Sequence, residues 1–130
     1  MSSFFAYPTE PAEPAGLQTE EWDALLAATE TLRFQPGDVV LTAGERDRAL
    51  YFLLDGRLHA DAGAVSAPAT VGVTAFVDGL PQAETLRAAT HGELARLSWD
   101  AFEALSARDA RLGRAVLLHL ANGLAARLRA

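Results

Sequence analysis

The sequence predicts a mainly β protein with flanking helices, and three observations support this fold class. Residues 31–97 hold short apolar runs separated by glycine-containing turns, which is the pattern of successive strands. Apolar residues recur at helical spacing on both sides of this region, at about 20–29 and about 98–129. The chain has 130 residues, of which 50% are hydrophobic, so it can bury the core of one domain.

The first 16 residues form a proline-rich, acidic segment. Pro8, Pro11 and Pro14 argue against a helix, because proline lacks a backbone donor and restricts the residue before it. We therefore predict a flexible N-terminal tail at 1–16, whose two phenylalanines could dock on the body of the protein. The rest of the chain, 17–130, is predicted to form a single domain.

A short amphipathic helix is expected at about 20–29. Thr19 is a candidate N-cap, because its hydroxyl can accept a hydrogen bond from the first turn. The two glutamates that follow favour the positive end of the helix dipole. The face that packs on the domain would carry Trp22, Leu25, Leu26 and Thr29.

The strongest strand signal in the β region is the apolar run at 50–54. It ends at Asp55-Gly56, a favoured two-residue hairpin turn, so we expect a hairpin there. The apolar run at 39–41 and the alternating segments at 85–88 and 94–97 fit further strands. Residues 60–70 are small and weakly patterned, which predicts a loop or a short hairpin.

Two helices are expected after the last strand. Ser98 is a good N-cap, with Phe102 and Leu105 on the apolar face of the first helix. The second, at about 109–129, carries an apolar stripe of Leu112, Val116, Leu120, Leu124 and Leu128, with Leu117 alongside. The aromatic residues expected in the core are Trp22, Tyr51, Phe76, Trp99 and Phe102.

The charge of the chain argues against a nucleic acid partner. The formal net charge is -6 and the pI is near 4.9, so the protein repels phosphate backbones unless its charge is segregated. Five arginines lie in residues 108–130, and we interpret them as a solvated helix face. The sequence shows neither a membrane-length apolar run nor a signal peptide, which predicts a cytoplasmic protein with no membrane partner.

No constellation of residues predicts catalysis. The chain has no cysteine, which excludes disulfides and thiolate metal sites. His59, His91 and His119 are far apart in sequence and lack the spacing of metal ligands. We therefore expect no catalytic residues and no metal site, and interpret the protein as non-enzymatic.

A skeleton of glycines and apolar residues runs through the chain from residue 32. Its elements are Phe34-x-x-Gly37-Asp38-x-Val40, Gly44, Leu50-Tyr51-x-Leu53-x-x-Gly56-x-Leu58, Gly72, Asp78-Gly79-x-Pro81 and Leu94-x-Arg96-Leu97-Ser98-x-x-x-Phe102. At these spacings the chain resembles the cyclic-nucleotide-binding domain of the catabolite activator protein and FNR regulator family. The glycines shape a β-roll whether or not it holds a ligand, so they bear on the fold alone.

The resemblance implies a jelly-roll-like β-roll of cupin-like architecture, with an N-terminal helix and a long C-terminal helix. It also implies a regulatory module of signal transduction. The family often dimerises through its last helix, so a homodimer through that helix is one expectation and simple packing on the roll is the other. A different protein partner is also open. The winged helix-turn-helix of the family's transcription factors is missing from the sequence, so we expect no nucleic acid partner.

Residues 71–86 have the frame of the family's phosphate-binding cassette, and three contact positions depart from its pattern. Val73 replaces a glutamate that accepts from the ribose hydroxyl, and Gln82 replaces an arginine that neutralises the phosphate. Glu84 brings a carboxylate to a position where the family usually has a small residue. The full set of positions that the resemblance assigns to ligand binding is Gly72, Val73, Thr74, Gln82, Ala83, Glu84 and Thr85.

These departures argue against tight binding of cAMP or cGMP. A buried ribose hydroxyl without a partner costs about 1–3 kcal/mol, and two like charges about 4 Å apart in a partly shielded site repel by about 4 kcal/mol. With the phosphate charge also uncompensated, the penalties approach the roughly 8 kcal/mol of a micromolar site. The interval from Gly56 to Gly72 is also short for the family, which trims one wall of the pocket.

The sequence thus predicts a stand-alone regulatory or interaction module that has no cofactor and cannot bind cAMP or cGMP in the usual way. One alternative is a functional sensor of a cyclic nucleotide, or of another small ligand, with an altered pocket. Another is a metal-dependent enzyme of the cupin type, which shares the β-roll architecture.

Overall fold

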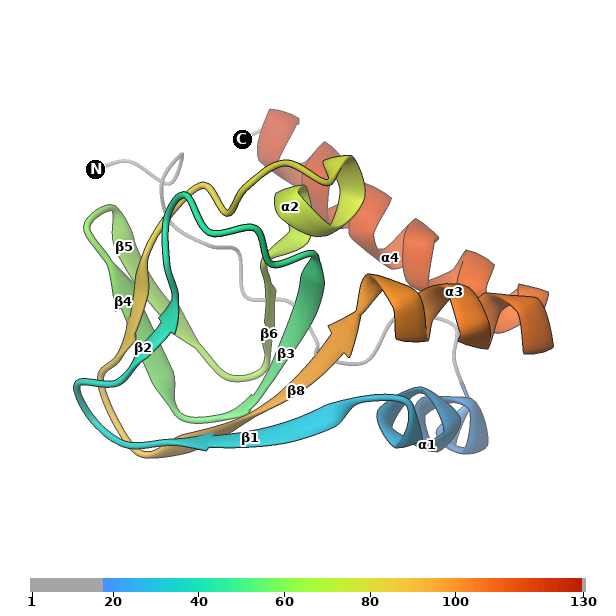
Figure 1. Ribbon diagram of the computed structural model, residues 1–130, viewed down its shortest axis with the longest axis horizontal. Helices are drawn as coiled ribbons and strands as arrows, with labels where there is room; N and C mark the ends of the chain where they lie inside the picture. The colour runs from blue at the N-terminus through green and yellow to red at the C-terminus, as the bar shows by residue number, and fades with distance from the viewer. Residues whose placement is uncertain (1–17, 130) are drawn as a thin grey trace.

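Two four-stranded antiparallel sheets form a β-roll, and helices gather at one end of it (Figure 1). This computed structural model describes residues 18–129. It confirms the predicted fold class, a mainly β roll with an N-terminal helix and a long C-terminal helix. The predicted tail at 1–16 lies outside the described residues.

The two sheets divide the strands between them. The first has the order β1, β8, β3, β6, with bounds Glu30–Phe34, Gly92–Ser98, Ala49–Asp55 and Ala69–Val71. The second has the order β2, β7, β4, β5, with bounds Val39–Leu41, Leu86–Ala88, Arg57–Ala60 and Gly63–Ser66. The helices are α1 (Thr19–Ala27), α2 (Val73–Asp78), α3 (Trp99–Arg108) and α4 (Ala110–Arg129).

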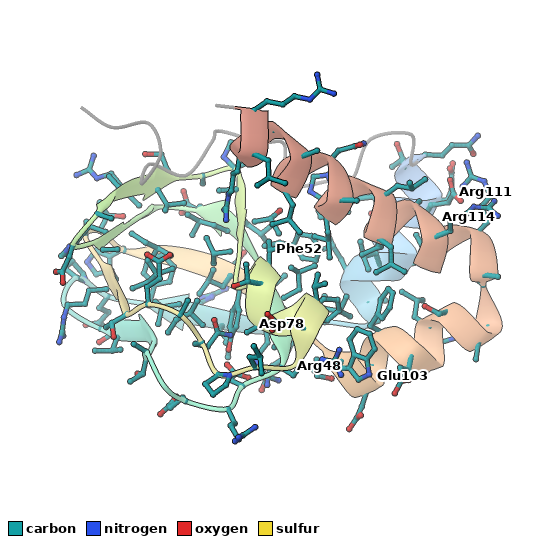
Figure 2. The ribbon with its side chains drawn as sticks, turned by 90° about the horizontal axis from the view of Figure 1, so that it is seen from above. Arg48, Phe52, Asp78, Glu103, Arg111 and Arg114 are labelled. Atoms are coloured by element: carbon teal, nitrogen blue, oxygen red, sulfur yellow. The ribbon has the colours of Figure 1, made fainter. Side chains whose placement is uncertain are left out.

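Strand β3 lies at the centre of the molecule, because its two faces belong to two different cores. Tyr51 and Leu53 point into the roll, where they join the apolar residues of both sheets. Leu50 and Phe52 point the other way, into the layer between the first sheet and the helices, and Figure 2 shows Phe52 in this layer. A strand buried on both faces appears in the sequence as a continuous apolar run rather than an alternating one.

Several predicted elements match the structure closely. The strands expected at 39–41, 85–88 and 94–97 correspond to β2, β7 and β8. Ser98 caps α3, because its hydroxyl accepts a hydrogen bond from the backbone N–H of Ala101 at 3.1 Å. On α4 the predicted stripe is buried at Leu112, Val116 and Leu120. The stripe does not continue to the end of the helix, since Leu128 is 88% exposed.

Three predictions of local structure were wrong. The N-cap of α1 is Gln18, whose extended backbone precedes the helix and whose N–H donates to the carboxylate of Glu21 at 3.1 Å, whereas Thr19 is already helical. Asp55-Gly56 does not join a hairpin, because β3 and β4 belong to different sheets. Residues 73–78 form helix α2 within a region that was expected to hold only strands and turns.

The weakly patterned segment at 60–70 resolves into short elements. β4 and β5 form a tight hairpin around Asp61 and Ala62, with Ala60 opposite Gly63. β6 follows and pairs with β3, bringing the chain directly to Gly72. Of the two expectations for this segment, the hairpin was therefore correct. Within residues 18–129, no helix is both long and apolar enough to cross a membrane.

Candidate ligand-binding site

Helix α2 is short, with six residues, and lies between two glycines. Gly72 precedes it with φ +79° and Gly79 ends it with φ +73°, both in the left-handed region that favours glycine. A Cβ atom at Gly72 would also lie 3.0 Å from the backbone oxygen of Ala49. The backbone therefore requires glycine here, which fixes the direction in which the chain leaves β6 and enters α2.

The buried face of α2 packs on α3. Phe76 is fully buried, and its ring makes edge contacts with Trp99 and Phe102 at centroid distances of 5.1 and 5.4 Å. Edge contacts of this kind are a favoured aromatic geometry. The cluster joins α2 to the C-terminal helices as one packed unit.

Arg48 holds the C-terminal end of α2 by hydrogen bonds, a role that was not predicted from the sequence. Its Nε and Nη2 atoms donate to the carbonyls of Phe76 and Val77 at 2.9 and 3.1 Å. These carbonyls belong to the last turn of α2, where the helix itself provides no hydrogen-bond donors. Its guanidinium carbon lies 3.6 Å from the centroid of the Trp99 ring. Figure 2 shows Arg48 beside α2, close to the start of α3. No motif marks this arginine, because its partners are backbone carbonyls 28 and 29 residues away.

Gln82 is buried, with 5% of its surface exposed. Its side-chain Nε2 donates to the carbonyl of Asp47 at 2.8 Å. Its backbone is tied to the same loop, because the N–H of Gln82 donates to the carbonyl of Glu45 and the N–H of Gly44 donates to the carbonyl of Gln82. The side-chain amide of Gln82 therefore has a structural role, because its Nε2 atom already donates a hydrogen bond within the protein.

Glu84 and Arg127 meet at the same cavity, although they lie on different elements. Glu84 is partly buried in the loop before β7, and Arg127 is partly buried in the last turn of α4. Burial raises the pKa of the Glu84 carboxyl, and the positive charge of Arg127 opposes that rise. The interpretation of all five C-terminal arginines as a solvated face was therefore wrong for Arg127.

The cavity at this point is very small, at about 30 Å³. That is room for about one water molecule, whereas small-molecule sites usually measure about 300–1,000 Å³. It is lined by Leu41, Gly72, Val73, Thr74, Gln82, Ala83, Glu84 and Arg127. The structure thus brings together six of the seven residues predicted for the site, and it adds Leu41 and Arg127.

Thr85, the seventh predicted residue, faces a different space. Its hydroxyl accepts a hydrogen bond from the backbone N–H of Ala43 at 3.0 Å. Beside the small cavity lies a wider, open hollow of about 530 Å³ between the β4–β5 hairpin and β7. The charged or titratable side chains that line this hollow are His59, Asp61, Glu84 and Arg87.

Comparison with known proteins decides the family. The model of the cyclic nucleotide-binding domain matches residues 31–109, more than half of the chain. The chain belongs to the cyclic nucleotide-binding domain family. No curated protein sequence matches it significantly.

Solved structures of this family share the fold. A cyclic nucleotide-binding domain from Methylobacillus flagellatus is 28% identical with a TM-score of 0.79, over 87% of this chain and 69% of that one. The catabolite activator protein of Thermus thermophilus is 24% identical with a TM-score of 0.76, over 88% of this chain and 57% of that one. The regulatory subunit of a cAMP-independent protein kinase A from Trypanosoma brucei is 25% identical with a TM-score of 0.65, over 80% and 40%.

In this cyclic nucleotide-binding domain the carboxylate of Asp47 is also engaged. It accepts a hydrogen bond from Arg96 Nη2 at 2.7 Å and another from the hydroxyl of Tyr51. Burial and the bond to Asp47 raise the pKa of Tyr51 to about 12. Both the carbonyl and the carboxylate of Asp47 are therefore used inside the domain, next to the cassette.

The three histidines lie in three different places. His59 and His91 are exposed, while His119 is buried on α4 with its Nε2 atom 3.4 Å from the hydroxyl oxygen of Thr70. Within residues 18–129, no three or more His, Cys, Asp and Glu side chains are arranged to hold a metal ion.

Proposed function

We propose that this chain is a regulatory module of the cyclic nucleotide-binding domain family that does not hold cAMP or cGMP and works through protein contacts. The observation that carries the proposal is the closed cassette. Its cavity has a volume of about 30 Å³, and Glu84 and Arg127 line it together. A cyclic nucleotide is far larger than this cavity, so binding there would require its lining side chains, Glu84 and Arg127 among them, to move.

The chemistry of the cassette supports the same conclusion. Val73 offers no acceptor for a ribose hydroxyl, and the buried amide of Gln82 has a donor committed to Asp47. The repulsion expected from Glu84 is weaker than the sequence suggested, because Arg127 brings a positive charge to the same cavity. Lack of space and of polar partners therefore weighs more than charge.

One relative makes such a function reasonable for the family. The Trypanosoma brucei protein, 25% identical to this chain, is described as the regulatory subunit of a cAMP-independent protein kinase A, and its structure is that of a mutant bound to cAMP. A domain of this fold thus occurs in the regulatory subunit of a kinase that is cAMP-independent.

A protein partner has an exposed apolar surface to bind on α4. Leu117, Leu118 and Leu128 of this helix are 44%, 56% and 88% exposed. Self-association through this helix is the simplest use of the surface. The molar mass measured by light scattering distinguishes a homodimer from a monomer that uses the surface for another protein.

The experiment that tests the proposal is a thermal shift with millimolar cAMP and, separately, cGMP. A ligand at about 100 times its Kd stabilises the protein by about 2.7 kcal/mol, so the absence of any shift is the expected result. The matched control is the triple variant Val73→Glu, Gln82→Arg, Glu84→Ala, which restores the contact chemistry and should gain a shift. A clear shift of the natural sequence would refute the proposal.

The second candidate function is a sensor of another small ligand, and the hollow of about 530 Å³ beside the cassette favours it. Its volume falls within the range of ligand sites, and it carries charges of both signs. In this case a screen of metabolites should give a shift that His59→Ala or Arg87→Ala removes. Indifference of binding to both substitutions would exclude this site.

A further inference from the structure

The last turns of α4 lie beside the cassette, as Figure 1 shows at the C-terminal end of the chain. The apolar stripe of the helix does not explain this position. Leu112, Val116 and Leu120 are buried, but Leu124 is only partly buried and Leu128 is 88% exposed. Beyond Leu120 the helix therefore needs a different contact to stay on the roll.

Arg127 is in the right place to provide that contact. It lines the cassette cavity with Gly72, Val73 and Glu84, whereas its neighbour Arg129 is exposed. Among the residues of 18–129 that line the cavity, Glu84 and Arg127 are the charged ones. The charge of Arg127 acts on the Glu84 carboxyl, and burial of that carboxyl acts in the opposite direction.

In the described part of the chain, three other charged or titratable groups line the adjoining hollow together with Glu84. They are His59 and Asp61 on the β4–β5 hairpin and Arg87 on β7, and all three are exposed. Water screens exposed charges more strongly than partly buried ones. Glu84 lines both the open hollow and the small cavity, and Arg127 is the cation that lines the small cavity with it.

We propose that the cassette of this chain is a cation site, and that its occupant is the guanidinium of Arg127 from the chain's own α4. Glu84 supplies the counter-charge. The arginine takes the position of an external ligand and holds the last turn of α4 against α2 without any nucleotide. The helix is therefore closed over the cassette in the resting protein.

Hydrogen exchange of the amides at 121–129, measured without nucleotide, tests this proposal. Arg127→Gln and Glu84→Gln should each speed exchange about 1.5- to 5-fold, the range that corresponds to measured ion pairs of this exposure. The double variant should be no faster than the faster single one, because both changes remove the same contact. Arg127→Lys, which keeps the charge, should remain slower than Arg127→Gln.

Arg129→Gln is the matched control, since it removes an arginine of the same turn that lies outside the cavity. Its exchange should equal that of the natural sequence. The amide of Phe52, in the centre of β3, serves as an internal reference for global unfolding. If Arg127→Gln exchanges no faster than Arg129→Gln, or if the effects of Glu84→Gln and Arg127→Gln simply add, the proposal is wrong.

The outcome does not depend on the proposed function, because no nucleotide is present in the experiment. Should the natural sequence bind cAMP, the cation site could still exist, and the nucleotide would have to displace Arg127. In that event cAMP should speed exchange at 121–129. Failure of the proposed function can therefore be distinguished from failure of the cation-site proposal.

Discussion

The side-chain amide of Gln82 donates a 2.8 Å hydrogen bond to the backbone carbonyl of Asp47. This bond joins the end of the cassette to the segment that leads into β3. The carboxylate of Asp47 is held in turn by Arg96 and Tyr51. At the position where the family resemblance places a phosphate-binding arginine, this chain has a buried structural contact.

Replacing Gln82 by alanine should therefore destabilise the domain. The change leaves the Asp47 carbonyl without its partner and opens space around a side chain that is 5% exposed. The expected cost is about 1–3 kcal/mol in urea unfolding. Thr74→Ala, at an exposed position of the same cassette, should stay within about 0.5 kcal/mol of the natural sequence. Equal stabilities of the two variants would contradict the structural role of Gln82.

Arg48→Ala should also destabilise the domain, and should loosen α2 first. The variant loses two hydrogen bonds to the last turn of α2 and the contact with Trp99. We expect a loss of about 1.5–3 kcal/mol and faster hydrogen exchange at 73–79. Arg48→Lys should recover only part of the loss, because an ammonium cannot donate in the geometry of a guanidinium.

The exposed neighbour Arg46 offers the control for this measurement, and Arg46→Ala should leave both stability and exchange unchanged. If exchange at 73–79 rises no more in Arg48→Ala than in Arg46→Ala, Arg48 does not hold the helix.

Glu84 should give the protein a measurable pH dependence. Burial raises its pKa above 4.5 in the folded state, so the folded protein binds this proton more tightly than the unfolded chain does. The stability that Glu84 contributes is then fully present below its unfolded pKa and is lost as the pH rises through the folded pKa. Glu84→Gln should remove this loss, and should be at least as stable as the natural sequence at pH 7.

Urea unfolding at several pH values between about 4 and 7 checks this prediction. The natural sequence should lose more stability over that interval than Glu84→Gln does. Parallel curves for the two proteins would show that the carboxyl is not affected by burial. Glu84→Gln is expected to gain overall stability, because it removes a buried charge, while the amides of the last turn of α4 exchange faster, because the contact with Arg127 is lost. These two opposite effects separate the burial of Glu84 from its contact with Arg127.

Tyr51 should ionise at an unusually high pH. Its pKa is raised to about 12 by burial and by the hydrogen bond to Asp47. The chain has two tyrosines, so an ultraviolet absorbance titration should lose its high-pH step in Tyr51→Phe. Because the folded pKa exceeds the unfolded value of 10.0, the contribution of Tyr51 to stability falls as the pH rises from about 10 to 12. Titration of both tyrosines near pH 10 in the natural sequence, with no step at higher pH, would contradict the buried network.

The fold could be predicted from the sequence because its signals are local. The apolar run of β3, the cap at Ser98 and the early repeat of α4 each follow from neighbouring residues. The hairpin expected at Asp55-Gly56 shows where local signals fail. The same dipeptide can turn a strand back on itself or carry the chain into another sheet, and only long-range pairing decides between these two outcomes.

The candidate site was predictable only in part, for the same reason. The family frame located the six cassette residues that share the cavity. Arg127 and Arg48 escaped prediction, because their roles depend on where α4 and β3 lie relative to α2. The residues around an arginine in a polar helical turn do not indicate which surface of the protein that turn will contact. The hydrogen bond from Gln82 to a backbone carbonyl likewise has no side-chain partner in the sequence to reveal it.

The central claim is that the cassette is closed to cyclic nucleotides, and amide NMR spectra of the isotope-labelled protein test it most directly. Millimolar cAMP or cGMP should leave the resonances of Gly72, Val73, Glu84 and Thr85 in place, while the triple variant that restores the contact residues should show saturable shifts at the same amides. Saturable shifts at these positions in the natural sequence would contradict the claim.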